Sequence, residues 1–169
     1  MFVFGVEADI DYLGATKTFT STANVQGAPV LASLSQKLDW LGSVRGRLGI
    51  APAPSWLLYL TGGLAYGNTS FSHFYGLPGP NIGFAGAITD SVRTGWIAGI
   101  GAEYMVTPNW TVRGEYLYYD LGSTRVFGAP FNQPANGFGG DALYTTRGSI
   151  ARVGLNYKFG WGGPVVAKY

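Results

Sequence analysis

The chain of 169 residues contains no cysteine, one histidine and few charged residues. The absence of cysteine excludes disulfide scaffolds, thiol nucleophiles and cysteine-ligated metals. Charged residues make up 12% of the chain, about half of the roughly 25% that soluble domains contain. No run of about 18 apolar residues is present, so the sequence predicts no membrane-spanning helix. The net charge of +2 comes from dispersed basic residues and gives no reason to expect nucleic acid as a partner.

Aromatic residues are abundant at 15% of the chain, which argues against disorder. Apolar and polar residues alternate over six segments, and this period of two predicts strands. Each segment has about 11–14 residues, whereas strands of soluble proteins have about 5–6 and strands that cross a membrane about 9–11. The six predicted strands cover residues 2–13, 37–50, 56–67, 93–106, 110–121 and 149–159.

Charges lie on one face of every predicted strand. In the first segment, Phe4 and Val6 alternate with Glu7 and Asp9. The uncharged face of the second segment includes Leu38, and Asp120 is the only charge that falls on an uncharged face. A charge that faces lipid at mid-bilayer costs about 2–4 kcal/mol. The pattern therefore predicts an all-β, antiparallel transmembrane β-barrel with an apolar outside and a charged inside. The predicted interior charges are Glu7, Asp9, Asp11, Lys37, Asp39, Arg45, Arg47, Arg93, Glu103, Arg113, Glu115, Arg152 and Lys158.

Outward aromatic residues concentrate near the ends of the predicted strands, where membrane barrels carry aromatic girdles at the headgroup level. The predicted girdle comprises Trp56, Tyr66, Trp96, Tyr104, Trp110, Tyr118, Tyr157 and Phe159. The connections alternate in length. Residues 51–55 and 107–109 read as short turns, whereas 14–36, 68–92 and 122–148 read as long loops rich in Gly, Pro, Asn, Ser and Thr. This alternation predicts periplasmic turns and extracellular loops.

The inward charges allow two interpretations. Arg45, Arg47, Arg113 and Glu115 can line a selective pore, or they can form a network of ion pairs that plugs the barrel. We favour the plug, because a barrel of about eight strands is just wide enough for side chains to fill. The acidic row of Glu7, Asp9 and Asp11 can serve as an acid-base set or a cation site, but pairing with the inward basic residues is the simpler explanation.

The single histidine, His73, is followed by two aromatic residues and is the candidate haem ligand. The chain contains neither a G-x-S-x-G motif nor a phosphate-binding G-x-x-x-x-G-K-[ST] motif. We expect no enzymatic activity, no cofactor and no metal.

Residues 38–52 (LDWLGSVRGRLGIAP), 94–122 (TGWIAGIGAEYMVTPNWTVRGEYLYYDLG) and 150–159 (IARVGLNYKF) resemble the small outer-membrane β-barrel family of alphaproteobacteria, as does 2–12 (FVFGVEADIDY). This family includes the Brucella-type major outer-membrane antigens and is often labelled the porin family. The resemblance implies an eight-stranded barrel of the OmpA membrane-domain type. Residues 1–159 would supply its last six strands, with two further strands and a signal peptide expected upstream of Met1.

Residues 160–169 are expected to form a short periplasmic tail. The implied function is a structural outer-membrane barrel that supports the envelope and presents its loops at the surface. Its expected partners are outer-membrane lipid, lipopolysaccharide, the barrel assembly machinery and other envelope proteins. The alternatives are a narrow diffusion channel and the binding of haemin or a host surface through 68–92 and 122–148, since haemin binding has been attributed to members of this family.

Overall fold

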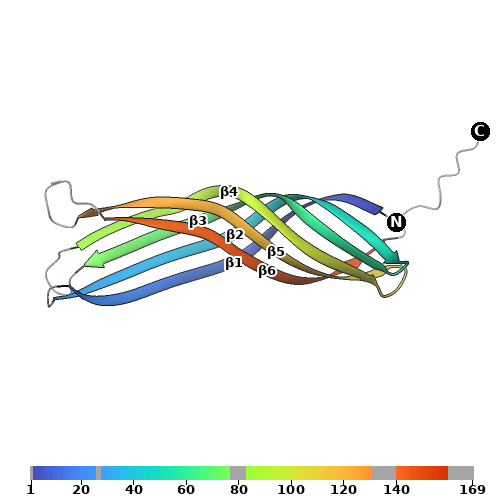
Figure 1. The fold of residues 1–169 in the computed structure, drawn as a ribbon, viewed down its shortest axis with the longest axis horizontal. Coiled ribbons are helices and arrows are strands. Elements are labelled where there is room, and N and C mark those ends of the chain that lie inside the picture. Colours follow the sequence, from blue (N-terminus) through green and yellow to red (C-terminus); the bar gives the residue numbers. More distant parts are fainter. Residues whose placement is uncertain (1, 26–27, 77–82, 131–139, 160–169) are drawn as a thin grey trace, which may run out of the picture.

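The computed structural model describes residues 2–25, 28–76, 83–130 and 140–159. These residues form one antiparallel sheet in which each strand pairs with the next in chain order (Figure 1). The strands are β1 (Phe2–Val25), β2 (Ala28–Ala53), β3 (Trp56–Gly76), β4 (Gly83–Met105), β5 (Trp110–Pro130) and β6 (Gly140–Tyr157). The described part of the chain contains no helix that is long and apolar enough to span a membrane. The prediction of an all-β antiparallel fold is confirmed.

The prediction of three long loops is wrong, because β-structure continues through most of 14–36, 68–92 and 122–148. The strands contain 18–26 residues, far more than the roughly 9–11 that a bilayer requires. In β1, Thr16, Thr18, Thr20 and Thr22 alternate with other residues, and β-branched threonine favours strands. The polar composition of these segments therefore belongs to strands that continue beyond the apolar layer, and not to loops. Residues 160–169 lie outside the described part.

We call the end of the sheet with the turns at 54–55 and 106–109 the turn end, and the opposite end the hairpin end. At the hairpin end the strands continue as three long hairpins (Figure 1). Trp56 and Tyr66 are ten residues apart on β3, which corresponds to about 25 Å across the membrane at the rise and tilt usual for barrel strands. Strand β3 then runs ten residues further to Gly76. The hairpins therefore extend beyond an apolar band of membrane thickness by a similar distance.

Irregularities in the ladders change which residues face inward. The pairing of β2 with β3 shifts between Leu38 and Trp40. Because of this shift, Leu38 is buried inside and Lys37 is exposed, the reverse of the prediction for both residues. Gly14 and Gly122 lie at two other shifts with φ of 53° and 78°, a backbone region in which glycine is strongly favoured.

The two faces of the sheet differ as the alternation predicts. On the convex face, large apolar side chains such as Leu60, Leu64 and Ile100 are more than half exposed. On the concave face, Arg45 and Leu117 are each about 1% exposed. Two apolar clusters also occupy the concave face. The first contains Leu38, Leu41, Ala65, Ile97, Leu117, Tyr119 and Leu121. The second contains Phe71, Val126, Ala142 and Tyr144, with Leu34 and Ile88 packed against it.

Candidate functional site

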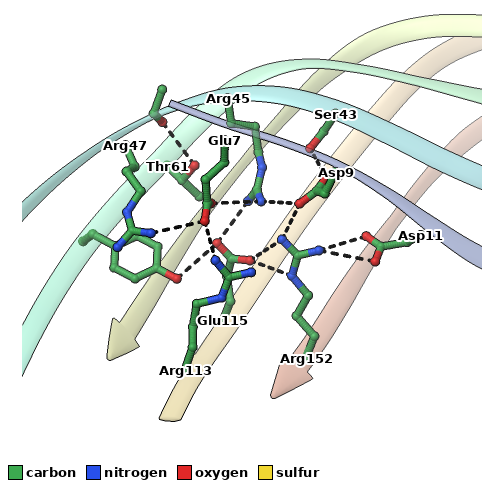
Figure 2. Close-up of polar contacts among 12 residues, drawn as sticks. Glu7, Asp9, Asp11, Ser43, Arg45, Arg47, Thr61, Arg113, Glu115 and Arg152 are labelled. Carbon is green, nitrogen blue, oxygen red and sulfur yellow. Dashed lines mark hydrogen bonds and ion pairs between the residues drawn. The ribbon is translucent and has the colours of Figure 1, made fainter. Parts of the chain in front are cut away.

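The candidate site is a network of ion pairs on the concave face, centred on Arg45 of β2 (Figure 2). The Arg45 side chain is fully buried. Its Nη1 donates to Glu115 Oε1 at 3.0 Å, and its Nη2 donates to Asp9 Oδ2 at 2.6 Å and to Glu7 Oε2 at 3.3 Å. A single guanidinium therefore joins carboxylates from β1 and β5, and the fork geometry of arginine suits this multiple pairing.

Arg152 closes the network from β6. Its Nε donates to Glu115 Oε2 at 2.7 Å, its Nη2 contacts Asp9 Oδ2 at 2.5 Å, and its Nη1 contacts Asp11 Oδ2 at 3.0 Å. Ser43 Oγ adds a hydrogen bond of 2.5 Å to Asp9. Among the described residues no backbone ladder joins β1 to β6. These side chains therefore bring the two edge strands together across the interior.

The turn end of the network is organised around Glu7. Its Oε1 accepts hydrogen bonds from Arg47 Nη1 at 3.2 Å and from Arg113 Nη1. Arg47 Nη2 donates to Glu103 Oε1 at 2.7 Å. The Arg47 guanidinium also lies 4.1 Å from the centre of the Tyr59 ring, within the range of a cation–π interaction.

Nine of the thirteen predicted interior charges thus belong to one network, and the other four lie outside it. Lys37 pairs with Asp39 at 2.5 Å near the shift in β2, and half of the Lys37 side chain is exposed. Arg93 lies apart from the network, and its buried Nε has no hydrogen-bond partner among the described residues. Lys158 follows the end of β6 and is exposed.

The sequence interpretation missed the apolar residues that fill the interior beside the charges. Leu117 is the next inward residue after Glu115 toward the hairpin end, and Leu41 lies two inward positions beyond Arg45. Beyond this first cluster lies a layer of buried threonines, where Gln36 Nε2 donates to Thr146 Oγ1 at 2.9 Å. Regular alternation from Arg45 back to Leu41, and from Glu115 on to Leu117, was the signal that could have identified these residues.

The outward aromatic residues form two groups. At the turn end, Trp56 contacts Tyr104 and Trp110 contacts Tyr157, both with ring centres 4.8 Å apart. Phe159 follows the end of β6, and its ring lies 4.8 Å from that of Tyr157. Toward the hairpin end, Trp96 contacts Tyr118 at 5.6 Å and Trp40 contacts Tyr66 at 5.9 Å. We call these pairs the turn-end belt and the hairpin-end belt.

His73 lies far from the ion-pair network, on the concave face of the β3 extension. Its side chain is buried, and neither ring nitrogen has a hydrogen-bond partner among the described residues. A Cβ at Gly86 would lie 2.7 Å from His73 Cε1, so the ring fits only against glycine. Haem iron could reach this imidazole only if the hairpin opened. No group of three or more His, Asp or Glu among the described residues could hold a metal ion.

An exposed apolar band between two aromatic belts, around a concave face of paired charges, defines the class of membrane-spanning β-barrel proteins. The chain belongs to the family described as the outer membrane protein beta-barrel domain, whose sequence profile matches residues 3–161.

Curated relatives support this membership. The 31 kDa outer-membrane immunogenic protein of Brucella melitensis is 35% identical over 154 residues, which are 90% of this chain and 58% of that protein. The protein of the same name from Brucella suis gives the same values. The 22 kDa outer membrane protein of Rhizobium leguminosarum is 36% identical over 123 residues, 72% of this chain and 46% of that protein. The chain thus spans less than two thirds of these relatives. No solved structure matches it.

Proposed function

We propose that this chain is a structural, non-conducting barrel of the outer membrane that supports the envelope and presents its long hairpins outside the cell. The observation that carries this proposal is the packing of the interior. The side chains of Arg45 and Glu115 are both fully buried and paired with each other. A water-filled pore would leave such charges hydrated, whereas a packed interior leaves no path for solutes.

Two successive layers support this interpretation. The ion-pair network draws carboxylates and guanidinium groups from β1, β2, β4, β5 and β6. The first apolar cluster lies directly beyond it toward the hairpin end. An ion on its way through would have to separate buried charge pairs, each costing about 3–5 kcal/mol to break, and then cross an apolar layer without water.

The direction of insertion follows from the two ends of the sheet. Outer-membrane barrels have short turns in the periplasm and longer segments outside. We therefore assign the turns at 54–55 and 106–109 to the periplasm and the hairpins to the exterior. The Brucella relatives are named immunogenic proteins, which fits surface presentation by this chain too. The relatives are named as outer-membrane proteins and not as enzymes, and we propose no catalytic role.

Planar-bilayer recording tests the proposal. We expect no discrete openings from the refolded protein, and we expect openings from a variant that combines Arg45→Ala, Glu115→Ala and Leu117→Ala. Regular openings of the unmodified protein that change with Arg45→Ala alone would instead establish the narrow diffusion channel. The variant Thr20→Cys tests the orientation by biotinylation of intact cells. Labelling that occurs only after cell lysis would place the hairpins in the periplasm.

A further inference from the structure

The part of the sheet beyond the hairpin-end belt, which we call the extension, contains hairpins that no continuous backbone ladder joins. Pairing between β4 and β5 stops at Trp96, which lies opposite Asp120, and resumes only at Ala85. We call this interruption, with residues 86–95 on one side and 121–128 on the other, the β4–β5 seam. In the same region β3 is paired with β4, and β5 is paired with β6. The seam therefore divides the extension between the β3–β4 hairpin and the β5–β6 hairpin.

Side chains from both hairpins hold the seam together on the concave face. The rings of Phe71 on β3 and Tyr144 on β6 lie 4.9 Å apart between their centres. The Tyr144 hydroxyl donates a hydrogen bond of 2.7 Å to the carbonyl oxygen of Ser72. Both rings belong to the second apolar cluster, which also takes Val126 from β5. Because no backbone ladder crosses the seam, the packing of this cluster decides whether the two hairpins stay together.

His73 is buried at the seam without a polar partner. It lies on β3 opposite Leu34, which packs against the second cluster, and opposite Gly86 of β4. A Cβ at Gly86 would lie 2.4 Å from the carbonyl oxygen of Phe127 on β5, so β4 and β5 touch here. His73 is 3% exposed, and neither ring nitrogen has a hydrogen-bond partner among the described residues. A buried polar group without a partner is costly even when it is uncharged, so its presence needs an explanation.

Among the described side chains, the surroundings of the imidazole contain no negative charge. The titratable groups nearest to it on the concave face are the hydroxyls of Tyr75, whose ring lies 5.6 Å away between centres, and of Tyr144. Tyrosine is uncharged near neutral pH. Strands β2 and β4 have no charged residue opposite the ring, at 28–36 and 83–88, and Arg125 of β5 is exposed on the outward face. A protonated imidazole would therefore be a buried charge without a carboxylate partner, which is strongly unfavourable.

We propose that protonation of His73 opens the extension along the β4–β5 seam, so that the hairpins pack together at neutral pH and separate in acid. The closed packing accommodates the neutral ring, whereas the open form exposes the ring to water, where the imidazolium is hydrated. A free imidazole gains its proton near pH 6.5. Opening therefore increases as the pH falls below about 6.5 and is suppressed above it, because the open form binds the proton more tightly. The extension lies beyond the apolar band, so this opening depends on neither conductance nor orientation.

Cysteine accessibility tests the opening, since the chain contains no cysteine of its own. The variant Ala142→Cys places a thiol in the second cluster, at a position that is 6% exposed. Thr20→Cys gives an exposed reference, and the ratio of the two rates of reaction with dithiodipyridine in micelles corrects for the pH dependence of thiol chemistry. We expect this ratio to rise about 30-fold between pH 7.5 and pH 5.0, the limit for a ring that binds its proton only in the open form. Adding His73→Leu, which removes the titrating group, should hold the change within about twofold.

Two controls separate this opening from other effects of acid. Ala65→Cys places a thiol in the first cluster, at a position that is 1% exposed, and it should stay unreactive at pH 5.0. The side chains of Asp90 and Asp141 lie outside the described part, and replacing both by asparagine should leave the rise at Ala142→Cys unchanged. A rise of less than about threefold, or a rise that persists with His73→Leu, would overturn the proposal. So would an equal rise at Ala65→Cys, or the loss of the rise in the asparagine variant.

Heat-modifiable migration on gels shows that each variant is folded. If His73→Leu does not fold, the imidazole signal in nuclear magnetic resonance spectra decides, because His73 is the single histidine of the chain. Its protonation must follow the same pH dependence as the reactivity of Ala142→Cys. An imidazole that becomes protonated while this cysteine stays unreactive would show that the closed extension tolerates the charge, and this too would overturn the proposal.

Discussion

Replacing Glu115 by glutamine should destabilise the protein by about 3 kcal/mol. The Glu115 side chain is fully buried and accepts hydrogen bonds from Arg45 at 3.0 Å, Arg152 at 2.7 Å and Tyr59 at 3.3 Å. Removing one partner of a buried ion pair costs about 3–5 kcal/mol, because the other partner keeps its charge. We expect the lower end of this range, because Arg45 retains Asp9 and glutamine keeps one acceptor oxygen.

The measurement is urea unfolding of the refolded protein in detergent micelles, followed by tryptophan fluorescence. The matched control is Glu103→Gln, which removes the same charge from the same interior. Glu103 accepts a hydrogen bond from Arg47 alone among the described residues, at 2.7 Å, and its side chain is 16% exposed. We expect it to lower the free energy of unfolding by about 1 kcal/mol. Equal losses for the two variants, or a Glu115→Gln curve that overlays that of the unmodified protein, would refute the central position of Glu115.

Two further predictions concern packing and pH. A Cβ at Gly101 would lie 2.2 Å from the Tyr59 ring, whereas one at Gly114 would meet nothing within 4 Å. Gly101→Ala should therefore lower the free energy of unfolding by about 1–3 kcal/mol, and Gly114→Ala by less than about 0.5 kcal/mol, both measured by urea unfolding. Burial raises the pKa of Tyr144 above its ordinary value of 10.0, and the hydroxyl donates to the carbonyl of Ser72 at 2.7 Å. Since the folded state holds this proton more tightly, the stabilisation is complete below pH 10 and is lost as the pH rises through the raised pKa. Tyr144→Phe should cost about 1 kcal/mol at pH 8 and flatten the alkaline decline in stability; an unchanged decline would contradict it.

Much of the fold could be predicted from the sequence because lipid imposes a strict rule on one face of each strand. The outward positions of Leu60, Leu64 and Ile100 follow from that rule, and all three are exposed. The rule no longer applies where the strand leaves the membrane, because polar residues that face water occur in strands and in loops alike. The threonines of β1 from Thr16 to Thr22 favour a strand by propensity, but the polar composition of this segment could not by itself separate a strand from a loop.

Only part of the candidate site could be predicted from the sequence. Alternation could identify the inward phase of Glu7, Asp9, Arg45, Glu115 and Arg152, since their spacing from the neighbouring apolar residues is regular. It could not give the partners, because Arg152 and Asp9 are 143 residues apart and meet only through the curvature of the sheet. Nor could it detect the irregular pairing between Leu38 and Trp40. An unpaired extra residue in a strand cannot be recognised from composition, yet every residue beyond it in that strand faces the opposite side of the sheet.

That exchange of faces extends the apolar layer that the regular alternation begins at Leu41 and Leu117. Between the belts, inward positions hold charges that pair across the sheet, and Arg45 is buried among them. Beyond the shift in β2, the same strand turns Leu38 inward to join Leu41, and Lys37 outward. Without the shift, Lys37 and Asp39 would both have turned into the apolar cluster, and removing each charge from water costs several kcal/mol. The irregular pairing therefore adds Leu38 to the apolar layer and keeps Lys37 outside it, so that the interior stays apolar where the β1–β2 hairpin begins.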